Sequence, residues 1–481
     1  MLIKSATKPV SVNPLKVGQP LGGVLALQGM YRSMPLLHGA QGCSAFSKAL
    51  LTRHFREPIA VQTSALQEMD VIFDADRNLE EALDHIWSKH HPDVIGVIST
   101  ALTEVAGVDF QSRVKAFKRE RALKDSLLFS VSLPDFHGSL ETGYSSTVES
   151  LMDAVLGLAG GKSPKKQRRT QVNLLPASYL TAGDVMEIKD IIASFGLEVI
   201  TLPDISTSLS GHLLTGFSPL TRGGTPLDSA CQMLESSCTI AIGASMERPA
   251  RRLTHAAGIP YHLFTGLSGL AASDAFIHFL QKISREPAPV RFRWQRENLL
   301  DSMLDAHFYY SGASAVVALE PDHMLSTAAW LEEMGVELKR LITPCSTPAL
   351  QKTEREVWIG DLDDAEESAQ GVDLWISNSH GRKGAARAGA SFVPAGLPVY
   401  DELGAHTSVS VGYRGTMEWV NKVGNVLLAE RGRGEDEGCI CDGRRRACEC
   451  SFWAESHVHY IRNPALRRPV PGASADSPGE R

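Results

Sequence analysis

Short apolar runs rich in β-branched residues alternate with longer amphipathic stretches along most of this chain. Uninterrupted apolar runs predict strands that are buried on both faces, as in parallel sheets covered by helices. The pattern therefore predicts an α/β fold with mainly parallel sheets. The clearest predicted strands are Val94–Ser99, Leu127–Leu133, Thr239–Ser245, Ser314–Leu319, Val336–Thr343, Glu356–Gly360 and Val372–Asn378.

Two breaks divide this pattern. Residues 160–169 (GGKSPKKQRR) and 285–289 (REPAP) lack apolar periodicity and read as linkers. A chain of 481 residues is too long for one core, and each block has the size of a Rossmann-like, doubly wound domain. We expect three such domains, at 1–165, 166–288 and 289–432, followed by a disordered tail at 433–481 where periodicity ends.

Composition excludes several classes of protein. The chain has 48 Lys and Arg against 55 Asp and Glu, a formal net charge of -7, so no basic field favours nucleic acid. No apolar run is long enough to span a membrane and the N-terminus does not resemble a signal peptide, which predicts a cytoplasmic protein without a membrane partner. In that compartment the eight cysteines do not imply a disulfide framework.

The common motifs of nucleotide and hydrolase chemistry are missing. The sequence contains no GxGxxG dinucleotide fingerprint and no GxxxxGK[ST] phosphate loop. It also contains no GxSxG elbow and no HExxH helix. The chemistry therefore has to be sought elsewhere, and we predict no catalytic acid, base or nucleophile.

The segment from Gln19 to Pro58 is the most unusual one. It reads as a helix, a glycine-punctuated turn and a second helix, with Cys43 in the turn HGAQGC. A sulfur near a helix N-terminus has a lowered pKa and favours the thiolate, the form that binds metal. A lone cysteine is also commonly a small buried residue, and the residue types alone do not decide between these interpretations.

A series of motifs extends from this segment along the chain. They are QPLGG at 19–23, HGAQGC at 38–43, RHFREP at 53–58, ISTALTEVAG at 98–107, LEP at 319–321, TPCSTP at 343–348, GDLDD at 360–364, NSHGR at 378–382 and GYRGT at 412–416. Together they resemble the component 1 proteins of nitrogenase over roughly residues 8–430. The resemblance implies three Rossmann-like domains of the nitrogenase component 1 type.

Three positions distinguish the members of that family. The catalytic β subunit places cysteines around its P-cluster where this chain has Gly18, Cys43 and Ala101. With one thiolate of the three, the usual P-cluster cannot be built. The pattern looks instead like the NifN family, the β-like subunits of the scaffold complex on which the iron-molybdenum cofactor matures.

That resemblance implies a metal site and partners. Cys43 would join three cysteines of a NifE-like subunit in holding one [4Fe-4S] cluster, because such a cluster takes four thiolates. The two subunits would form an α2β2 heterotetramer, to which the nitrogenase iron protein docks transiently. The iron-molybdenum cofactor precursor would be bound by the complex, mainly in the partner.

Residues next to Cys43 are candidates for the surroundings of the cluster. Backbone amides around Gly39 and Gly42 would stabilise an anionic cluster. We expect Thr103 and Glu104 to line the site without ligating metal, although Glu104 as a surface or capping carboxylate is the simpler interpretation. For His38, a hydrogen bond from the ring to the turn backbone is favoured over metal binding.

Other residues of these motifs receive structural interpretations. His54 and Arg56 read as packing or interface groups. We expect Cys231 and Cys238 on one face of a helix, packed into a core. Cys345 reads as a buried loop thiol, with a place in a crevice as the alternative.

The end of the chain carries a separate cluster of thiols. Cys439, Cys441, Cys448 and Cys450 form CxCx6CxC, which could surround a zinc ion tetrahedrally. The spacing differs from that of common zinc ribbons and lies beyond the resemblance. An adventitious or lineage-specific tail that binds no metal is the favoured interpretation, and a miscalled reading frame near the end is a further one.

Rival functions remain open on the sequence. They are a nitrogenase catalytic β subunit, a scaffold homologue of the vanadium system, a related reductase of the chlorophyll pathway, and a metal-free α/β ligand-binding protein. Gly18 and Ala101 disfavour the first. Cys43 disfavours the third, in which an aspartate is expected from this subunit.

Overall fold

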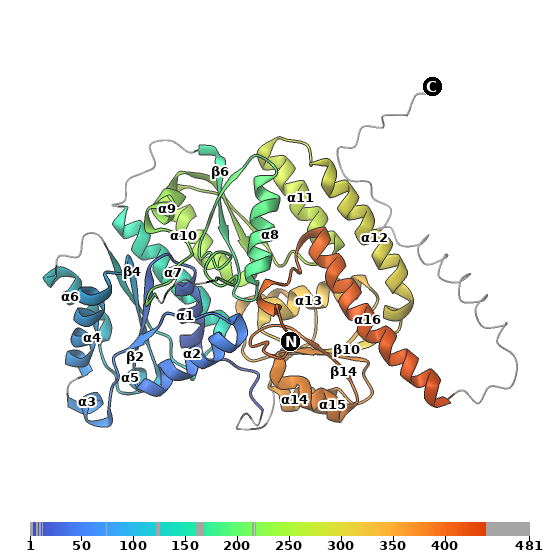
Figure 1. Cartoon of the computed structure of the whole chain (residues 1–481), viewed down its shortest axis with the longest axis horizontal. Coiled ribbons are helices and arrows are strands. Elements are labelled where there is room, and N and C mark those ends of the chain that lie inside the picture. Colours follow the sequence, from blue (N-terminus) through green and yellow to red (C-terminus); the bar gives the residue numbers. More distant parts are fainter. Residues whose placement is uncertain are drawn as a thin grey trace, which may run out of the picture.

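The chain folds around three parallel β-sheets, which Figure 1 shows at the left, top and lower right of the molecule. This computed structural model describes residues 3–5, 8, 11, 13–73, 75–121, 126–159, 168–213, 216 and 218–438. Every strand pairing between named strands is parallel. The prediction of an α/β fold with mainly parallel sheets is confirmed.

The first sheet has the strand order β3-β2-β4-β5. Its strands are β2 Ser33–His38, β3 Gln62–Thr63, β4 Val94–Ser99 and β5 Leu127–Val131, and its helices are α1 Gln19–Gln28, α2 Gln41–Phe55, α3 Glu68–Phe73, α4 Ala75–His90, α5 Ala101–Val105, α6 Phe110–Glu120 and α7 Leu140–Leu158. All residues of β2 and β4 are buried, which explains why these strands are apolar on both faces.

The interpretation of 19–58 as two helices joined by a turn is wrong in one respect. Strand β2 lies between the two helices and pairs with both β3 and β4. The strand was hidden because it is short and contains Pro35, which lacks an N–H group. The structure accommodates Pro35 because β3 pairs only with Leu36 and Leu37 on that side of β2.

The second sheet has the order β7-β6-β8-β9. Its elements are β6 Arg168–Leu175, α8 Ala182–Ala193, β7 Glu198–Thr201, α9 Leu227–Gln232, β8 Ser236–Ile242, α10 Glu247–Ala257, β9 Tyr261–Phe264 and α11 Leu270–Ser284. The prediction that Cys231 and Cys238 share a helix is wrong, because Cys231 lies on α9 and Cys238 on β8. Cys238 is buried in the core and Cys231 packs against it half-buried.

The third sheet has the order β1-β12-β11-β10-β13-β14. Its elements are β1 Ile3–Ser5, α12 Val290–Tyr310, β10 Ser314–Ala318, α13 Pro321–Glu333, β11 Glu337–Thr343, β12 Val357–Ile359, α14 Leu362–Ser368, β13 Leu374–Ser377, α15 Arg382–Ala388, β14 Ser391–Pro394 and α16 Gly412–Gly438. Short 3-10 helices are η1 Met233–Glu235, η2 Ala244–Met246, η3 Pro348–Lys352, η4 Ser379–Gly381 and η5 Ala405–Thr407.

The two ends of the chain bear on the domain boundaries. Strand β1, at the N-terminus, pairs with β12 and so belongs to the third sheet rather than to the first. Helix α16 continues to Gly438, past the start of the predicted tail at residue 433. The boundaries near residues 165 and 288 stay predictions, and the rest of the tail lies outside the described residues.

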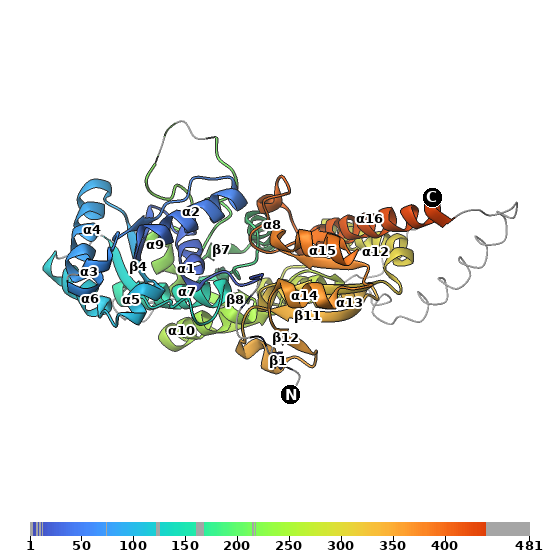
Figure 2. The same ribbon diagram turned by 90° about the horizontal axis from the view of Figure 1, so that it is seen from below.

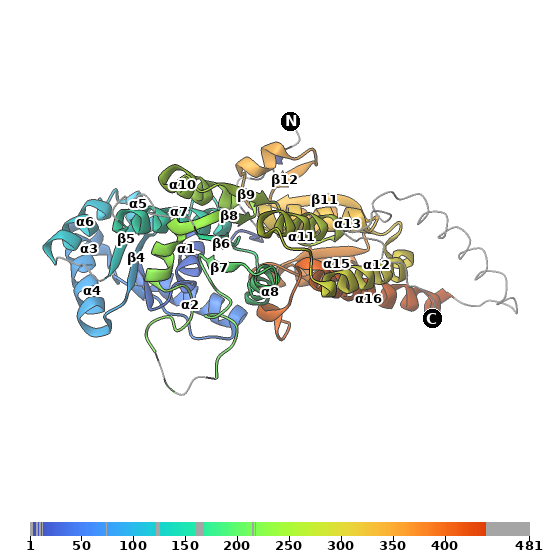
Figure 3. The same cartoon turned by 90° about the horizontal axis from the view of Figure 1, so that it is seen from above.

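Seen from below and from above, the molecule is elongated, with the first sheet at one end and α12 and α16 at the other (Figures 2 and 3). One hydrophobic core runs through all three sheets. Separate clusters cover the outer faces of the first and third sheets. None of the described helices is both long and apolar enough to cross a membrane.

Three helix N-termini meet where the sheets adjoin, and carboxylates cap them across the junction. Glu320, before α13, accepts a hydrogen bond from the Glu141 N–H of α7 at 3.3 Å. Glu141 in turn accepts one from the Asp322 N–H of α13 at 2.8 Å. Asp322 accepts from the N–H groups of Ala244 and Ser245 in η2, both at 3.0 Å. These carboxylates add to the capping of the three N-termini across the junction, and α7 also has its own capping box, formed by Ser139 and Thr142.

Candidate metal centre

Cys43 lies at the carboxyl end of a central strand. Strand β2 ends at His38, and Cys43 is the third residue of α2, with its N–H donating to the Ala40 carbonyl at 3.2 Å. In open α/β sheets this edge is where ligands bind, because turns there expose backbone amides. The N-terminus of α2 has no side-chain cap, so its amides remain available to an anionic group.

A surface hollow of about 510 Å3 adjoins this cysteine. It is far larger than the share of liquid volume taken by one water molecule, about 30 Å3. The lining includes Lys16, Gly18, Cys43, Phe46, Thr100 and Asp135. These residues come from the start of α1, from α2, and from the ends of β4 and β5, so the hollow is built by the carboxyl edge of the first sheet.

The positions of the two absent cysteines lie at the same hollow. Gly18 lines it directly, and Ala101 follows Thr100, which also lines it. A Cβ atom added at Gly18 would lie 2.0 Å from Oδ1 of Asp135. The space that a side chain at position 18 would enter is therefore filled by a carboxylate.

The electrostatics of Cys43 differ from the expectation. Burial raises the pKa of the Cys43 thiol, and the negative charge of Asp135 raises it further, while backbone hydrogen bonds at the start of α2 only partly oppose this. The prediction of a lowered thiol pKa is wrong for the chain by itself. A bound cation would reverse the balance, because a coordinating thiol is deprotonated outright.

His38 faces the interior of the first sheet. Its Nδ1 hydrogen-bonds the Ser64 hydroxyl at 2.9 Å, and the ring lies 6.0 Å from that of Phe110. Burial lowers the pKa of His38 to about 4, so the imidazole is neutral. His38 is not part of the lining of the hollow, and its hydrogen bond goes to a side chain rather than to the turn backbone.

The lining of the hollow does not include Gly39, Thr103 or Glu104. Thr103 Oγ1 accepts from the Thr100 N–H at 3.0 Å and closes the first turn of α5. Glu104 accepts a short hydrogen bond from the Ser132 hydroxyl. Gly39 packs against Thr100, whose Oγ1 would lie 2.4 Å from an added Cβ. Of the predicted site residues that the structure describes, Gly42 and Cys43 alone line the hollow.

Sequence reasoning missed Lys16, Phe46 and Asp135. Asp135 had a usable signal, because it follows the buried strand β5 and the carboxyl ends of parallel strands share one edge of a sheet. Phe46 had a weaker one, as an apolar residue one turn beyond Cys43. Its side chain is 62% exposed beside the hollow.

His54 and Arg56 join α2 to the segment after β14. His54 Nδ1 accepts from the Val399 N–H at 2.9 Å, and Arg56 donates to the Tyr400 carbonyl at 2.9 Å. Burial lowers the pKa of His54 to about 4. Within this chain both residues serve packing between the first and third sheets.

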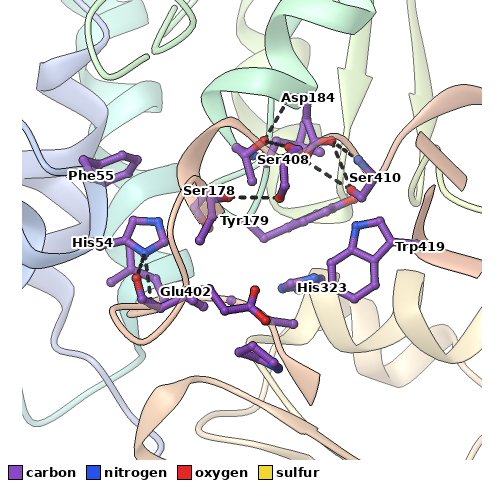
Figure 4. A pocket seen from close by; sticks show the side chains of 18 of the residues that line it. His54, Phe55, Ser178, Tyr179, Asp184, His323, Glu402, Ser408, Ser410 and Trp419 are labelled. Atoms are coloured by element: carbon purple, nitrogen blue, oxygen red, sulfur yellow. Dashed lines mark hydrogen bonds between the residues drawn. The ribbon is translucent and has the colours of Figure 1, made fainter. Parts of the chain in front are cut away.

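A second cavity, lined in part by His54, lies where α2, the start of α8 and α13 converge (Figure 4). Tyr179 and His323 stack there with ring centroids 4.8 Å apart. Within the described residues, Ser178 Oγ and His323 Nδ1 have no hydrogen-bond partner. The cavity has a volume of about 50 Å3, enough for a few water molecules that would satisfy these groups. No cysteine from the described part of the chain lines it.

The remaining thiols do not form a metal site within the described part of the chain. Cys345 is buried and donates to the Ser139 hydroxyl at 3.2 Å, and burial raises its pKa to about 12. No group of three or more His, Cys, Asp or Glu side chains suited to a metal ion occurs among the described residues. The predicted tail site, Cys439, Cys441, Cys448 and Cys450, lies outside them.

Comparison with known proteins shows which family has this architecture. The family profile of nitrogenase component 1 type oxidoreductases matches residues 18–428. The chain therefore belongs to the nitrogenase component 1 family.

Its relatives narrow the assignment further. Proteins named nitrogenase iron-molybdenum cofactor biosynthesis protein NifN are similar to almost the whole chain. The one from Rippkaea orientalis is 41% identical (89% of this chain, 96% of that protein), the one from Bradyrhizobium diazoefficiens 38% (89% and 92%), and the one from Klebsiella pneumoniae 37% (87% and 92%). Within the family, the chain belongs to the NifN group, which confirms the resemblance drawn from its motifs.

Solved structures agree with the fold. A chain described as "Nitrogenase Cp1 at pH 6.5" has a TM-score of 0.83 and 26% identity, covering 91% of this chain and 98% of that one. A second, "Nitrogenase Cp1 at pH 5", has a TM-score of 0.65 at 14% identity and covers 89% and 91%. The nitrogenase component 1 architecture is thus confirmed.

Proposed function

We propose that this chain is a scaffold subunit for biosynthesis of the nitrogenase iron-molybdenum cofactor. It pairs with a NifE-like subunit and shares a [4Fe-4S] cluster with it through Cys43. The observation that carries the proposal is a half-buried cysteine in a large hollow, beside a helix N-terminus without a side-chain cap. Thiolate ligands and nearby amide donors are what an iron-sulfur cluster requires.

The donor set of the hollow fits a shared cluster better than one held by this chain alone. A [4Fe-4S] cluster takes four thiolates, and Cys43 is the only cysteine in the described lining. Gly42 leaves room for a bulky group, because a Cβ there would meet no atom within 4 Å. The remaining thiolates come from the NifE-like partner in this proposal, and the cofactor precursor is bound mainly there.

Exposed apolar side chains around the hollow support a partner on this face. Phe46 lines the hollow and is 62% exposed, while Phe136, next to Asp135, is 55% exposed. Helix α5 begins directly after Thr100, which lines the hollow, and ends at Val105, which is 79% exposed. Exposed large apolar side chains are typical of a protein interface. We infer that they meet the partner subunit in an α2β2 heterotetramer.

A catalytic β subunit is a weaker candidate. Gly18 and Ala101 supply no thiolate, and the carboxylate of Asp135 occupies the space beside Gly18. Neither Gly18 nor Ala101 argues against a scaffold homologue of the vanadium system. Measuring which heterometal the purified complex incorporates distinguishes a molybdenum scaffold from a vanadium scaffold.

Metal analysis tests the proposal directly. The chain is purified anaerobically alone and with its NifE-like partner, and iron, acid-labile sulfide and EPR spectra are measured. We expect the isolated chain to be nearly free of iron and the pair to show a reducible [4Fe-4S] signal. Iron bound by the isolated chain would contradict a shared cluster and turn attention to the CxCx6CxC tail.

Substitution of the proposed ligand gives the matching prediction. Cys43→Ala is expected to lower the iron content of the complex or to change the EPR spectrum, because one of four ligands is lost. Cys231→Ala is the matched control, since Cys231 is also half-buried but lies on α9. Assembly of the heterotetramer, followed by gel filtration, should persist in both. A spectrum and iron content identical to wild type would remove Cys43 from the ligand set.

A further inference from the structure

Lys16 lies in the segment that leads into α1. Pro14, Lys16 and Gly18 line the hollow, whereas Leu15 and Val17 between them are buried. Neighbouring residues therefore face opposite sides, as they do in extended chain. Leu15 packs into the cluster on the outer face of the third sheet, and Val17 packs into the main core. These two anchors fix the backbone of Lys16 and direct its side chain to the hollow.

One hydrogen bond holds the ammonium group of Lys16 beside the hollow. Its Nζ donates to the Asp135 carbonyl at 2.7 Å, and Gln19 donates to the neighbouring Pro134 carbonyl at 2.8 Å. Among the hydrogen bonds and ion pairs between described residues, this is the only one of the Lys16 side chain. An ammonium group has three N–H donors. Two donors are therefore available to a group that enters the hollow.

The positive charge of Lys16 already acts on neighbouring groups. Of the described residues that line the hollow, Lys16 is the only one with a cationic side chain. Burial raises the pKa of the Asp135 carboxyl, and the charge of Lys16 opposes that rise. Burial also raises the pKa of Glu320, to about 7, and Lys16 opposes this rise as well. Lys16 thus stabilises negative charge at two separate groups.

A cluster bound at Cys43 would be exposed to the same charge. A [4Fe-4S] cluster with four thiolates is anionic, and its reduction potential depends on net charge and on hydrogen bonds to its sulfurs. Reduction adds a further negative charge, so a nearby cation stabilises the reduced form more than the oxidised form.

We propose that Lys16 raises the reduction potential of the shared cluster through its charge and its two remaining N–H donors. Lys16 does not ligate iron, because an ammonium group has no lone pair to donate. It is a positioning residue that makes the cluster easier to reduce. This inference rests on the proposed function.

Three substitutions separate the charge of Lys16 from its hydrogen bond. Lys16→Arg keeps the charge and the donors. Lys16→Gln keeps an N–H donor for the Asp135 carbonyl but loses the charge, and Lys16→Met loses both. Each full chain is purified anaerobically with the NifE-like partner, and the midpoint potential of the cluster is measured by redox titration followed by EPR.

We expect Lys16→Gln and Lys16→Met to shift the midpoint potential to more negative values. At the wild-type midpoint, the ratio of reduced to oxidised cluster should fall about tenfold, which is about 59 mV for a one-electron couple. Lys16→Arg should stay close to wild type. Iron and sulfide contents should be unchanged in all three, because no ligand is lost.

Lys48→Met is the matched control. Lys48 lies on α2, the helix that carries Cys43, and it is exposed without lining the hollow. Water and salt screen an exposed charge, so its loss should leave the midpoint potential unchanged. Gel filtration of each complex shows whether the heterotetramer is intact.

Three results would overturn the inference. A wild-type midpoint potential in Lys16→Gln, with its iron intact, would show that the charge has no effect on the cluster. An equal shift in Lys48→Met would show a general effect of surface charge. Loss of iron in Lys16→Gln and Lys16→Met would show that Lys16 retains the cluster rather than tuning it. A wild-type complex without a cluster signal would instead reject the proposed function and with it this inference.

Discussion

At the scale of single residues, glycines set how closely neighbouring backbone elements approach one another. A Cβ at Gly22 would lie 2.0 Å from the Leu140 carbonyl oxygen, where α1 crosses α7. Because this oxygen belongs to the backbone, it cannot move away by a side-chain rotation, and the two helices would have to separate. We expect Gly22→Ala to destabilise the chain by about 1–3 kcal/mol through overpacking. Gly18→Ala should cost less, because the Asp135 side chain can rotate. Urea denaturation midpoints compare the two, with Gly42→Ala as the uncrowded control.

The denaturation midpoint of Gly18→Ala also shows how firmly the Asp135 side chain is held beside Gly18. A loss for Gly18→Ala as large as that for Gly22→Ala would mean that the carboxylate is held rigidly in the hollow. A loss close to that of Gly42→Ala would mean that it moves freely. The second outcome is the expected one, since the side-chain oxygens of Asp135 have no hydrogen-bond or ion-pair partner among the described residues.

The sequence located Cys43 but not its surroundings. A cysteine in a glycine-rich turn before a helix is visible in a single stretch of chain. The approach of Asp135 to Gly18 depends instead on the register of β5 beside β4 and on the course of the following loop. Likewise, the raised pKa of Cys43 follows from burial and from Asp135, neither of which a local pattern contains.

At the scale of elements, the capping exchange between α7 and α13 predicts a dependence of stability on pH. Burial raises the pKa of Glu320 from its usual 4.5 to about 7. The folded chain therefore holds this proton more tightly than the unfolded chain, and the stability contributed by Glu320 falls as the pH rises from 4.5 through 7. Glu320→Gln keeps an oxygen acceptor and removes the titration. Denaturation midpoints should rise in the variant at pH 8 and change little at pH 5.

Buried groups that do not interact with Glu320 titrate in both chains and cancel in this comparison, whereas the pKa of Glu141, which the charge of Glu320 helps to raise, is lower in the variant. Burial raises the pKa of Asp184 to about 6 and lowers that of His323 to about 4. Their effects shift both pH profiles together. Parallel profiles for wild type and Glu320→Gln would show that Glu320 remains ionised at the junction despite its burial.

Some helices and strands of this fold could be predicted from the sequence, and others could not. The buried strands β4, β5, β10, β11 and β13 were predicted to within a few residues, because apolar runs flanked by polar ones mark strands covered on both faces. Strand β2 was missed because Pro35 argues against a strand unless the neighbouring chain leaves its side unpaired. The helix predicted through Cys231 and Cys238 was wrong because α9 and η1 end and β8 begins within that stretch.

At the scale of the whole molecule, the exposed apolar side chains of Phe46, Phe136 and Val105 predict where the partner docks. We expect Val105→Asp to weaken the heterotetramer roughly ten- to hundredfold, because an unpaired carboxylate buried in an interface costs about 1–3 kcal/mol. Val290→Asp is the matched control. Val290 is 67% exposed against 79% for Val105, and it begins α12, at the opposite end of the molecule from α5 (Figures 2 and 3).

Metal content links this assembly to the cluster. If the partner supplies most of the thiolates, the Val105→Asp chain should elute without iron as it dissociates, whereas Val290→Asp should retain both partner and iron. Gel filtration with iron analysis of each peak measures the two together. Dissociation with iron still bound to this chain would contradict a shared cluster. Equal dissociation of the Val290→Asp complex would instead show that the docking face extends beyond the hollow, Phe46, Phe136 and Val105.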